Sequence, residues 1–256
     1  MSDLSLFELF PTLDPWLMVG MAAIFLLAGT IKGFLGIGLP AAAMGLLTLF
    51  IAPKEAIPLL WLSILGTNIM QFAHAPQKRD IVTTYYPFAL AIIVSIFLTS
   101  MFIADYPPAL LTVAIGVAMV IFSLNLLIGF TLPIGPGNGW QVGVGLISGV
   151  LGGLSSIWSP AVAMYLVARN TPKERFIGAT GFLFLAGVLP LGAGQVIAGL
   201  ITLPVLLKSA VCMIFVLIGF RVGEVMRHRV SQDRFRTIVL IAFLIMGIRL
   251  IATGLL

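Results

Sequence analysis

Charged residues are scarce in this sequence, and their scarcity excludes most classes of protein at once. Only 9% of the 256 residues are Asp, Glu, Lys or Arg, whereas 60% are hydrophobic and the mean hydropathy is +1.16. A soluble domain has about 25% charged residues. So few charges cannot cover a water-facing surface, which excludes a soluble enzyme, a nucleic-acid-binding protein and a disordered regulator. The composition predicts an all-α polytopic membrane protein.

Cysteine and histidine are also rare, which limits the chemistry that the chain can perform. Cys212 is the single cysteine and lies in an apolar run, so the sequence has no disulfide framework. His74 and His228 fall in predicted loops, and no metal-ligand set or nucleophile–base pair occurs within an apolar segment. We therefore expect no metal, no other cofactor and no intramembrane enzyme activity. Because no apolar segment contains Asp or Glu, a proton relay through carboxylates is also unsupported.

Uncharged stretches, with the Pro and Gly residues between them, divide the chain into ten apolar segments. Tyr106 to Ala168 is uncharged over 63 residues, and one crossing of a bilayer takes about 20 residues. The predicted segments are 16–34, 39–51, 57–73, 82–104, 108–130, 139–154, 157–168, 176–199, 203–220 and 237–255. Segments 39–51 and 157–168 are too short for ordinary spans and are either short spans or the returning arms of re-entrant hairpins. We expect eight to ten transmembrane segments.

Basic residues mark one side of the membrane. The predicted loops 74–80, 169–175 and 221–236 share a side and hold ten basic residues: Lys78, Arg79, Arg169, Lys173, Arg175, Arg221, Arg227, Arg229, Arg234 and Arg236. The opposite loops hold Lys54 and Lys208. The positive-inside rule places the ten in the cytoplasm and both termini outside. The predicted location is therefore the bacterial inner (plasma) membrane, multi-pass, with both termini periplasmic.

The sequence contains an internal repeat. Gly29-x-x-x-Gly33-x-x-Gly36 recurs as Gly145-x-x-x-Gly149-x-x-Gly152, 116 residues later. A proline follows each copy, Pro40 and Pro160, and Pro53-Lys54-Glu55 is echoed by Pro172-Lys173-Glu174. With five segments per half, the second copy enters the membrane upside down. Inverted repeats with broken helices are typical of secondary transporters, whose substrate site lies at the repeat interface near the midplane.

The repeat predicts how the chain is organised. We expect an N-terminal tail (1–15), a first membrane repeat (16–130), a linker (131–138) and a second membrane repeat (139–256). Each repeat consists of a Gly/Pro-broken helical hairpin followed by three spanning helices. The tail has no Lys or Arg among its residues, which argues against a cleaved signal peptide and favours a translocated or interfacial segment.

Lys32 is the strongest candidate for a functional residue. It lies inside the first glycine motif, and a lysine at the centre of a membrane costs about 2.5–3.5 kcal/mol on insertion scales. The alternative is that Lys32 extends from a helix end to the interface. In the second copy the matching residue is Ser148, so the two halves are chemically unequal.

The two Gly/Pro breaks complete a predicted anion site. The second break contributes hydroxyl and backbone N–H donors, and helix N-termini that begin after such breaks attract anions. The predicted substrate-binding residues are Lys32, Gly33, Gly36, Gly38, Thr67, Asn68, Gly152, Ser155, Ser156, Trp158 and Ser159. Three alternatives stay open: glycines can serve close helix packing, serines can bond to preceding carbonyls, and Thr67 and Asn68 can form interhelical hydrogen bonds.

Three stretches of the sequence resemble a known family. AGTIKGFLGIGLP (28–40), SGVLGGLSSIWSPAVAMYL (148–166) and TPKERFIGATGFLF (171–184) are similar to the TauE/SafE sulfite-exporter family, which has two copies of a Gly-rich motif followed by proline. Family members often show a run of glycines where Leu39-Pro40 stands here. The resemblance covers essentially the whole chain. It implies transport of sulfite, sulfoacetate or related organosulfur anions, generally export from the cytoplasm of bacteria.

The residues alone indicate only that the protein is a transporter and that its substrate is an anion. A transporter of other small anions, such as carboxylates, and a non-transporting membrane subunit are the alternatives. We expect the small anionic substrate and the lipid bilayer to be the partners, leave a homo-oligomer open, and expect no nucleic acid.

Overall fold

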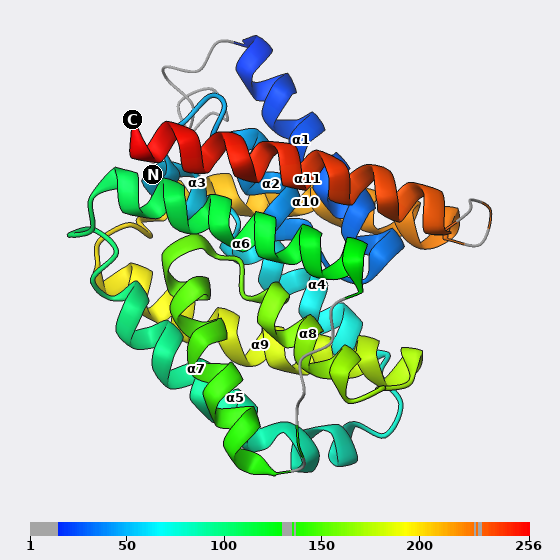
Figure 1. Ribbon diagram of the computed structural model, residues 1–256. Coiled ribbons are helices and arrows are strands. Elements are labelled where there is room, and N and C mark those ends of the chain that lie inside the picture. The colour runs from blue at the N-terminus through cyan, green and yellow to red at the C-terminus, as the bar shows by residue number, and fades with distance from the viewer. Residues whose placement is uncertain (1–14, 130–134, 136, 228, 230–231) are drawn as a thin grey trace, which may run out of the picture.

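The computed structural model describes residues 15–129, 135, 137–227, 229 and 232–256, and all secondary-structure elements in this part of the chain are helices (Figure 1). Its helices are α1 (Pro15–Leu35), α2 (Leu39–Leu47), α3 (Pro53–Leu59), α4 (Trp61–Ala73), α5 (Lys78–Ser100), α6 (Pro108–Ile128), α7 (Asn138–Ser155), α8 (Ser159–Ala168), α9 (Lys173–Ile197), α10 (Leu203–Met226) and α11 (Gln232–Leu255). The prediction of an all-α membrane protein is confirmed. Of the predicted tail (1–15) only residue 15 is among the described residues, and of the predicted linker (131–138) only residues 135, 137 and 138 are.

Each of the ten predicted segments contains helix. Segment 57–73 forms α4 together with α3, which begins at Pro53 because proline suits the first turn of a helix. Within the described residues, seven segments are long and apolar enough to cross a membrane: Met18–Leu35, Pro53–Ala73, Lys78–Ser100, Pro108–Ile128, Lys173–Ile197, Leu203–Met226 and Asp233–Leu255. The chain is therefore a multi-pass membrane protein, in which α2, α7 and α8 differ from the ordinary spans.

The short helices α2 and α8 are the returning arms of two broken hairpins. Gly36 and Gly38, with φ of +82° and +100°, turn the chain between α1 and α2, a conformation that favours glycine. Ser156, with φ of +59°, makes the corresponding turn after α7. A helix of nine or ten residues rises only about 15 Å, half of the hydrocarbon thickness, so neither α2 nor α8 crosses a membrane on its own.

The α7–α8 hairpin returns to the side from which it came. Gln141 near the start of α7 donates to the Thr84 carbonyl oxygen of α5, and Arg175, soon after α8, bonds the Thr84 hydroxyl and the Asp80 carboxylate. Both ends of the α7–α8 hairpin therefore lie at the start of α5. After α2, Lys54 donates to the Ala104 carbonyl oxygen, beyond the far end of α5.

Tight glycine contacts join the two halves. A Cβ on Gly29 or Gly33 of α1 would overlap the backbone of Val216 or Phe220 of α10. The residue numbers of the contacts rise together, so the two helices run parallel. In the second copy, α7 runs parallel to α5 in the same way, with Gly145 against Ala91 and Gly149 against Ser95. For these four glycines the packing alternative is confirmed.

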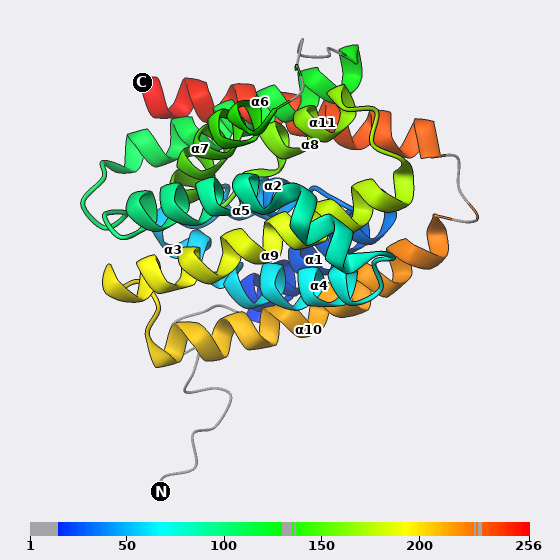
Figure 2. The same cartoon turned by 90° about the horizontal axis from the view of Figure 1, so that it is seen from below.

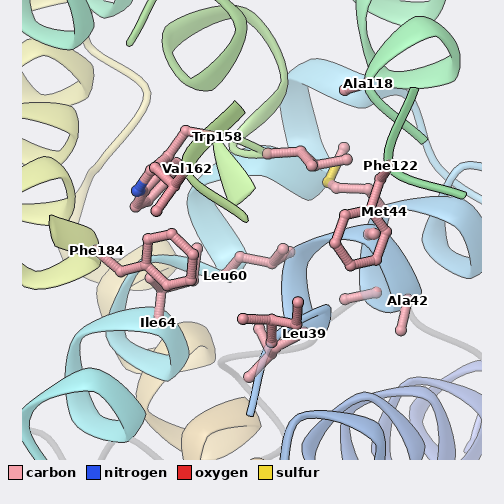
Figure 3. Packing of buried hydrophobic residues seen from close by; sticks show 14 of the residues in the cluster. Leu39, Ala42, Met44, Leu60, Ile64, Ala118, Phe122, Trp158, Val162 and Phe184 are labelled. Carbon is pink, nitrogen blue, oxygen red and sulfur yellow. The ribbon is translucent and has the colours of Figure 1, made fainter. Parts of the chain in front are cut away.

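The helix contacts have the pattern expected of two related halves. The counterpart of α1 in the second half is α7, and the counterpart of α5 is α10. The α1–α10 pair therefore corresponds to the α7–α5 pair, while the pairs α6–α11 and α4–α9 join the two halves. In Figure 2 most of the long helices lie side by side in one general direction. The buried core surrounds α2 and α8, and Figure 3 shows Leu39 and Met44 of α2 within it. The inverted orientation of the complete halves and the repeat boundaries stay predictions.

Candidate functional site

The two hairpin breaks meet at a small buried cavity, which we call the Lys32 cavity. It is lined by Lys32, Gly38, Pro40, Ile64, Asn68, Trp158, Ser159 and Phe184. The first three come from the break between α1 and α2, and Trp158 and Ser159 come from the break between α7 and α8. Phe184 lies midway along α9, so the cavity is near the centre of the membrane-spanning region.

Lys32 points into the protein and is held by one hydrogen bond. Its side chain is 2% exposed, and Nζ donates to Asn68 Oδ1 at 2.5 Å. The Asn68 amide is oriented in turn by its donation to the Ile64 carbonyl oxygen at 2.8 Å. Nζ also lies 5.8 Å from the centre of the Phe184 ring. This geometry excludes the alternative in which Lys32 extends to the membrane interface.

Among the described residues, Lys32 has no carboxylate beside it. The ion pairs found in the described part of the chain join Arg175 to Asp80 and Arg221 to Glu224. The same residues contain no group of His, Cys, Asp and Glu side chains that could hold a metal ion. A buried cation without a counter-ion is costly, and a bound anion would remove that cost.

Two further residues that line the cavity carry a donor without a partner among the described residues. The donors are Trp158 Nε1 and Ser159 Oγ, and both side chains are almost fully buried. The backbone of Trp158 is fixed because its carbonyl oxygen accepts from Ser148 Oγ at 2.8 Å. Its ring packs edge-on against Phe184, with centroids 5.8 Å apart, and Figure 3 shows Ile64 beside Phe184. The unpaired groups are donors, which is the arrangement that an anion with several acceptor oxygens would satisfy.

Two helix N-termini add to the positive field. Gly38 directly precedes α2, and Ser159 is the first residue of α8. In both helices proline occupies the second position, where it removes one N–H but leaves the others of the first turn. The N-terminal end of a helix carries a positive partial charge of about half a unit. Both ends open on the cavity that holds Lys32.

A comparison with protein families agrees with this arrangement. The family model described as sulfite exporter TauE/SafE matches residues 21–250. The chain belongs to this family. No curated protein and no solved structure matches it.

As a TauE/SafE family member, the chain is a membrane transporter. The resemblance of its Gly/Pro breaks to this family is thereby confirmed. The family is not a class of enzymes. The Lys32 cavity is therefore considered below as a site of substrate binding.

The Lys32 cavity is too small to hold a substrate in this structure. Its volume of about 10 Å³ is close to the minimum of about 10–15 Å³ that one water molecule needs. No oxyanion fits in so small a space. For a transporter, this geometry corresponds to a state in which the walls must separate before substrate can bind.

A much larger cavity, which we call the vestibule, lies on the side of the basic loops. Its volume is about 410 Å³, and it is lined by Gly36, Met70, Gln71, His74, Ala75, Pro76, Glu174, Ile177, Phe220, Arg221, Glu224 and Arg227. Arg227 is half-buried and donates to the Gly33 and Phe34 carbonyl oxygens at the end of α1. Burial lowers the pKa of Arg227, and Glu224 opposes that shift.

A thin wall separates the vestibule from the Lys32 cavity. On α4, Gln71 lines the vestibule, and Asn68, one turn away, lines the Lys32 cavity. Gln71 Nε2 bridges to α9 by donating to the Ile177 carbonyl oxygen at 2.8 Å and to Thr180 Oγ1 at 2.9 Å. At the break between α1 and α2, Gly36 lines the vestibule and Gly38 lines the Lys32 cavity. Movement of this wall would connect the two spaces.

The structure brings five of the predicted residues together, namely Lys32, Gly38, Asn68, Trp158 and Ser159. The other six lie outside the lining of the Lys32 cavity. Gly33 packs against α10, Gly36 lines the vestibule, and Gly152 packs behind Trp158.

The remaining hydroxyls are placed by local structure. Thr67 Oγ1 donates to the Ser63 carbonyl oxygen at 2.7 Å, and Ser155 Oγ donates to the Leu151 carbonyl oxygen at 2.5 Å. For Ser155 this is the back-bonded arrangement that the sequence leaves open as an alternative, whereas Thr67 bonds within its own helix and not between helices. Ser156 is buried at the left-handed turn, with no partner for Oγ among the described residues.

Sequence reasoning missed three residues of the cavity, namely Pro40, Ile64 and Phe184, as well as the role of Gln71. In the sequence, Pro40 marks only the end of the first repeat motif. Ile64 and Phe184 are apolar residues in apolar helices, so nothing in their local sequence marks them. Gln71 was visible as a polar residue one turn from Asn68.

Proposed function

We propose that this protein is a secondary transporter of small organosulfur anions, such as sulfite, sulfoacetate or similar sulfonates, and that it exports them from the cytoplasm across the bacterial inner membrane. Membership of the TauE/SafE family supports the transporter class and the sulfur oxyanion. The substrate binds at the Lys32 cavity when the wall beside Gln71 opens. Lys32 supplies the charge, and the α7–α8 break supplies neutral donors.

One observation carries the assignment of the site. Lys32 Nζ is buried with Asn68 as its hydrogen-bonding partner, and the two neighbouring donors, Trp158 Nε1 and Ser159 Oγ, have none among the described residues. Three side chains that carry donors therefore line the same cavity, and only the Lys32 donor is paired among the described residues. A sulfite or sulfonate group has three oxygens arranged as a pyramid, so it can accept from all three donors. A carboxylate can also accept three hydrogen bonds with its two oxygens, so the preference for sulfur anions over carboxylates rests on the family.

Counterflow in proteoliposomes tests this proposal, with labelled sulfite, sulfoacetate and acetate offered to the wild-type chain. The wild type is expected to exchange the sulfur anions faster than acetate. Absence of flux for any sulfur anion would refute the substrate class. Faster exchange of acetate would instead favour a carboxylate transporter.

Lys32→Met tests the site, because methionine keeps an unbranched chain of similar length without the charge. A hydrogen bond to a charged group contributes about 1.5–3 kcal/mol, so at least about a tenfold loss of flux is expected. Lys78→Met is the matched control, since Lys78 is exposed at the start of α5. Equal flux in Lys32→Met and the wild type, with both proteins eluting as monodisperse species, would refute the assignment of the Lys32 cavity as the substrate site.

The direction of transport is tested separately in cells loaded with sulfoacetate. Cells that express the wild type should lose the anion faster than cells that express Lys32→Met. Faster accumulation from the medium, with no faster loss, would reverse the proposed direction while leaving the site intact.

A further inference from the structure

A second cavity on the side of the basic loops, which we call the basic cavity, is separate from the Lys32 cavity. Its volume is about 230 Å³, and it lies where the ends of α1, α6, α8 and α10 meet the starts of α9 and α11. Its lining residues fall into two groups. The charged residues are Lys173, Arg227, Asp233 and Arg236, and the others are apolar.

The charges of the basic cavity are unbalanced. Three cations from three different helix ends face one carboxylate, which leaves a net charge of +2. Two of the cations are held in place by backbone carbonyl groups. Arg227 bonds the carbonyl oxygens at the end of α1, and Arg236 Nη2 donates to the Leu126 carbonyl oxygen at 2.7 Å near the end of α6. These positions are therefore fixed by the fold.

The remaining wall is apolar. It consists of Phe34, Leu35, Ile37, Leu126, Val167, Phe176 and Ile177. Val167 is exposed, so part of this surface reaches the outside of the helix bundle. A cationic rim above an apolar wall, at the level where spanning helices end, matches the boundary between lipid headgroups and acyl chains.

We propose that the basic cavity binds an anionic phospholipid of the cytoplasmic leaflet, with the phosphate group at Lys173, Arg227 and Arg236 and the glycerol and acyl region against the apolar wall. Cytoplasmic leaflets carry anionic lipids, and basic pockets between helices on that side recognise their headgroups. A free inorganic anion would pair with the cations but would leave seven apolar residues in contact with water. The phospholipid satisfies both groups of residues.

The bound lipid would contact the hairpin that carries Lys32. Phe34, Leu35 and Ile37 belong to the break between α1 and α2, and Arg227 lines both the basic cavity and the vestibule. Anionic lipid is therefore placed to stabilise one arrangement of the break. This proposal does not depend on which anion is transported.

Thermal unfolding of the purified full-length chain in mixed micelles tests the proposal. The probes are phosphatidylglycerol, phosphatidylcholine with matched acyl chains, and inorganic phosphate. We expect phosphatidylglycerol to raise the Tm more than phosphatidylcholine, because a ligand that binds the folded state stabilises it. An equal rise with both lipids would overturn the proposal, and a rise with phosphate alone as large as that with phosphatidylglycerol would show a site for free anions instead.

Two double variants locate the effect. Lys173→Gln with Arg236→Gln removes two cations of the basic cavity, and the rise in Tm caused by phosphatidylglycerol should fall by about half or more. Lys78→Gln with Arg234→Gln is the control, because it removes the same charge from exposed residues outside the lining. Each rise is measured against the same variant without lipid, so a change in basal stability does not enter. An equal loss in both double variants would show only nonspecific attraction and would overturn the proposal.

Discussion

At the scale of single residues, the indole N–H of Trp158 is expected to contribute to anion binding and not to folding. A buried donor without an acceptor costs about 1–3 kcal/mol, and Trp158 Nε1, in a residue that lines the cavity together with Lys32, has no acceptor within the part of the chain that the structure describes. Trp61 presents the opposite case, because its Nε1 donates to the Val188 carbonyl oxygen at 2.9 Å and so joins α4 to α9. The two tryptophans therefore have the same side chain with different hydrogen-bonding roles.

Replacement of each tryptophan by phenylalanine tests this difference. Trp158→Phe keeps an aromatic ring against Phe184 but removes the donor, so the KM for the transported anion should rise about tenfold with little loss of stability. Trp61→Phe should leave KM unchanged and lower the free energy of unfolding by about 1 kcal/mol. Initial rates in proteoliposomes and thermal unfolding measure the two quantities. A KM for Trp158→Phe equal to that of the wild type would remove this residue from the site.

How far the sequence predicts the site depends on the side-chain orientation of each residue. Lys32 and Asn68 stand out as polar residues in apolar segments, and both line the cavity. Thr67, the neighbour of Asn68, stands out equally but donates to its own helix at the Ser63 carbonyl oxygen. Consecutive residues of a helix point about 100° apart, and the sequence does not say which of the two directions faces the site. Phe184 gives no signal at all, because its position follows only from the packing of α9.

At the scale of helices, close packing explains several of the repeated glycines. Gly33 of α1 meets the Phe220 carbonyl group of α10, while Gly223 of α10 meets the Thr30 carbonyl group of α1. Without a hydrophobic driving force in lipid, such close backbone contact is a main source of helix association. The sequence shows both glycines, but it does not show that α1 pairs with a helix almost 200 residues away. That pairing depends on the packing of all the helices.

Two glycines of α1 test this role. Gly33→Ala places a Cβ in the backbone of α10, so we expect the helices to separate and the yield of monodisperse protein to fall severalfold. Gly20→Ala has open space around its Cβ and should stabilise the helix by up to about 1 kcal/mol. Size-exclusion chromatography and thermal unfolding measure both. Gly33→Ala protein of normal stability with a raised KM would show that Gly33 serves binding, as the sequence alone suggested.

At the scale of the whole molecule, contacts with the two ends of α5 indicate how the two halves are oriented. Asp80, in the first turn of α5, pairs with Arg175, which directly follows the second Pro-Lys-Glu copy. Beyond the last turn of α5, the Ala104 carbonyl oxygen accepts from Lys54 of the first copy. The 23 residues of α5 span about 34 Å as a helix. The two copies of one sequence motif therefore lie at opposite ends of a membrane-spanning helix, which is the placement that an inverted repeat requires.

Cysteine labelling turns this placement into a test of both repeat orientation and sidedness. In a Cys212→Ala background, Glu55→Cys and Glu174→Cys mark the exposed ends of the two Pro-Lys-Glu copies, and Lys78→Cys is a control on the side of Glu174. A membrane-impermeant maleimide should label Glu55→Cys in intact cells, and the other two only after permeabilisation, because the positive-inside rule predicts that the basic loops face the cytoplasm. Labelling of Glu55→Cys and Glu174→Cys from the same side would contradict the inverted repeat. The reverse pattern, with Glu174→Cys labelled in intact cells, would keep the inversion but place the basic cavity in the outer leaflet.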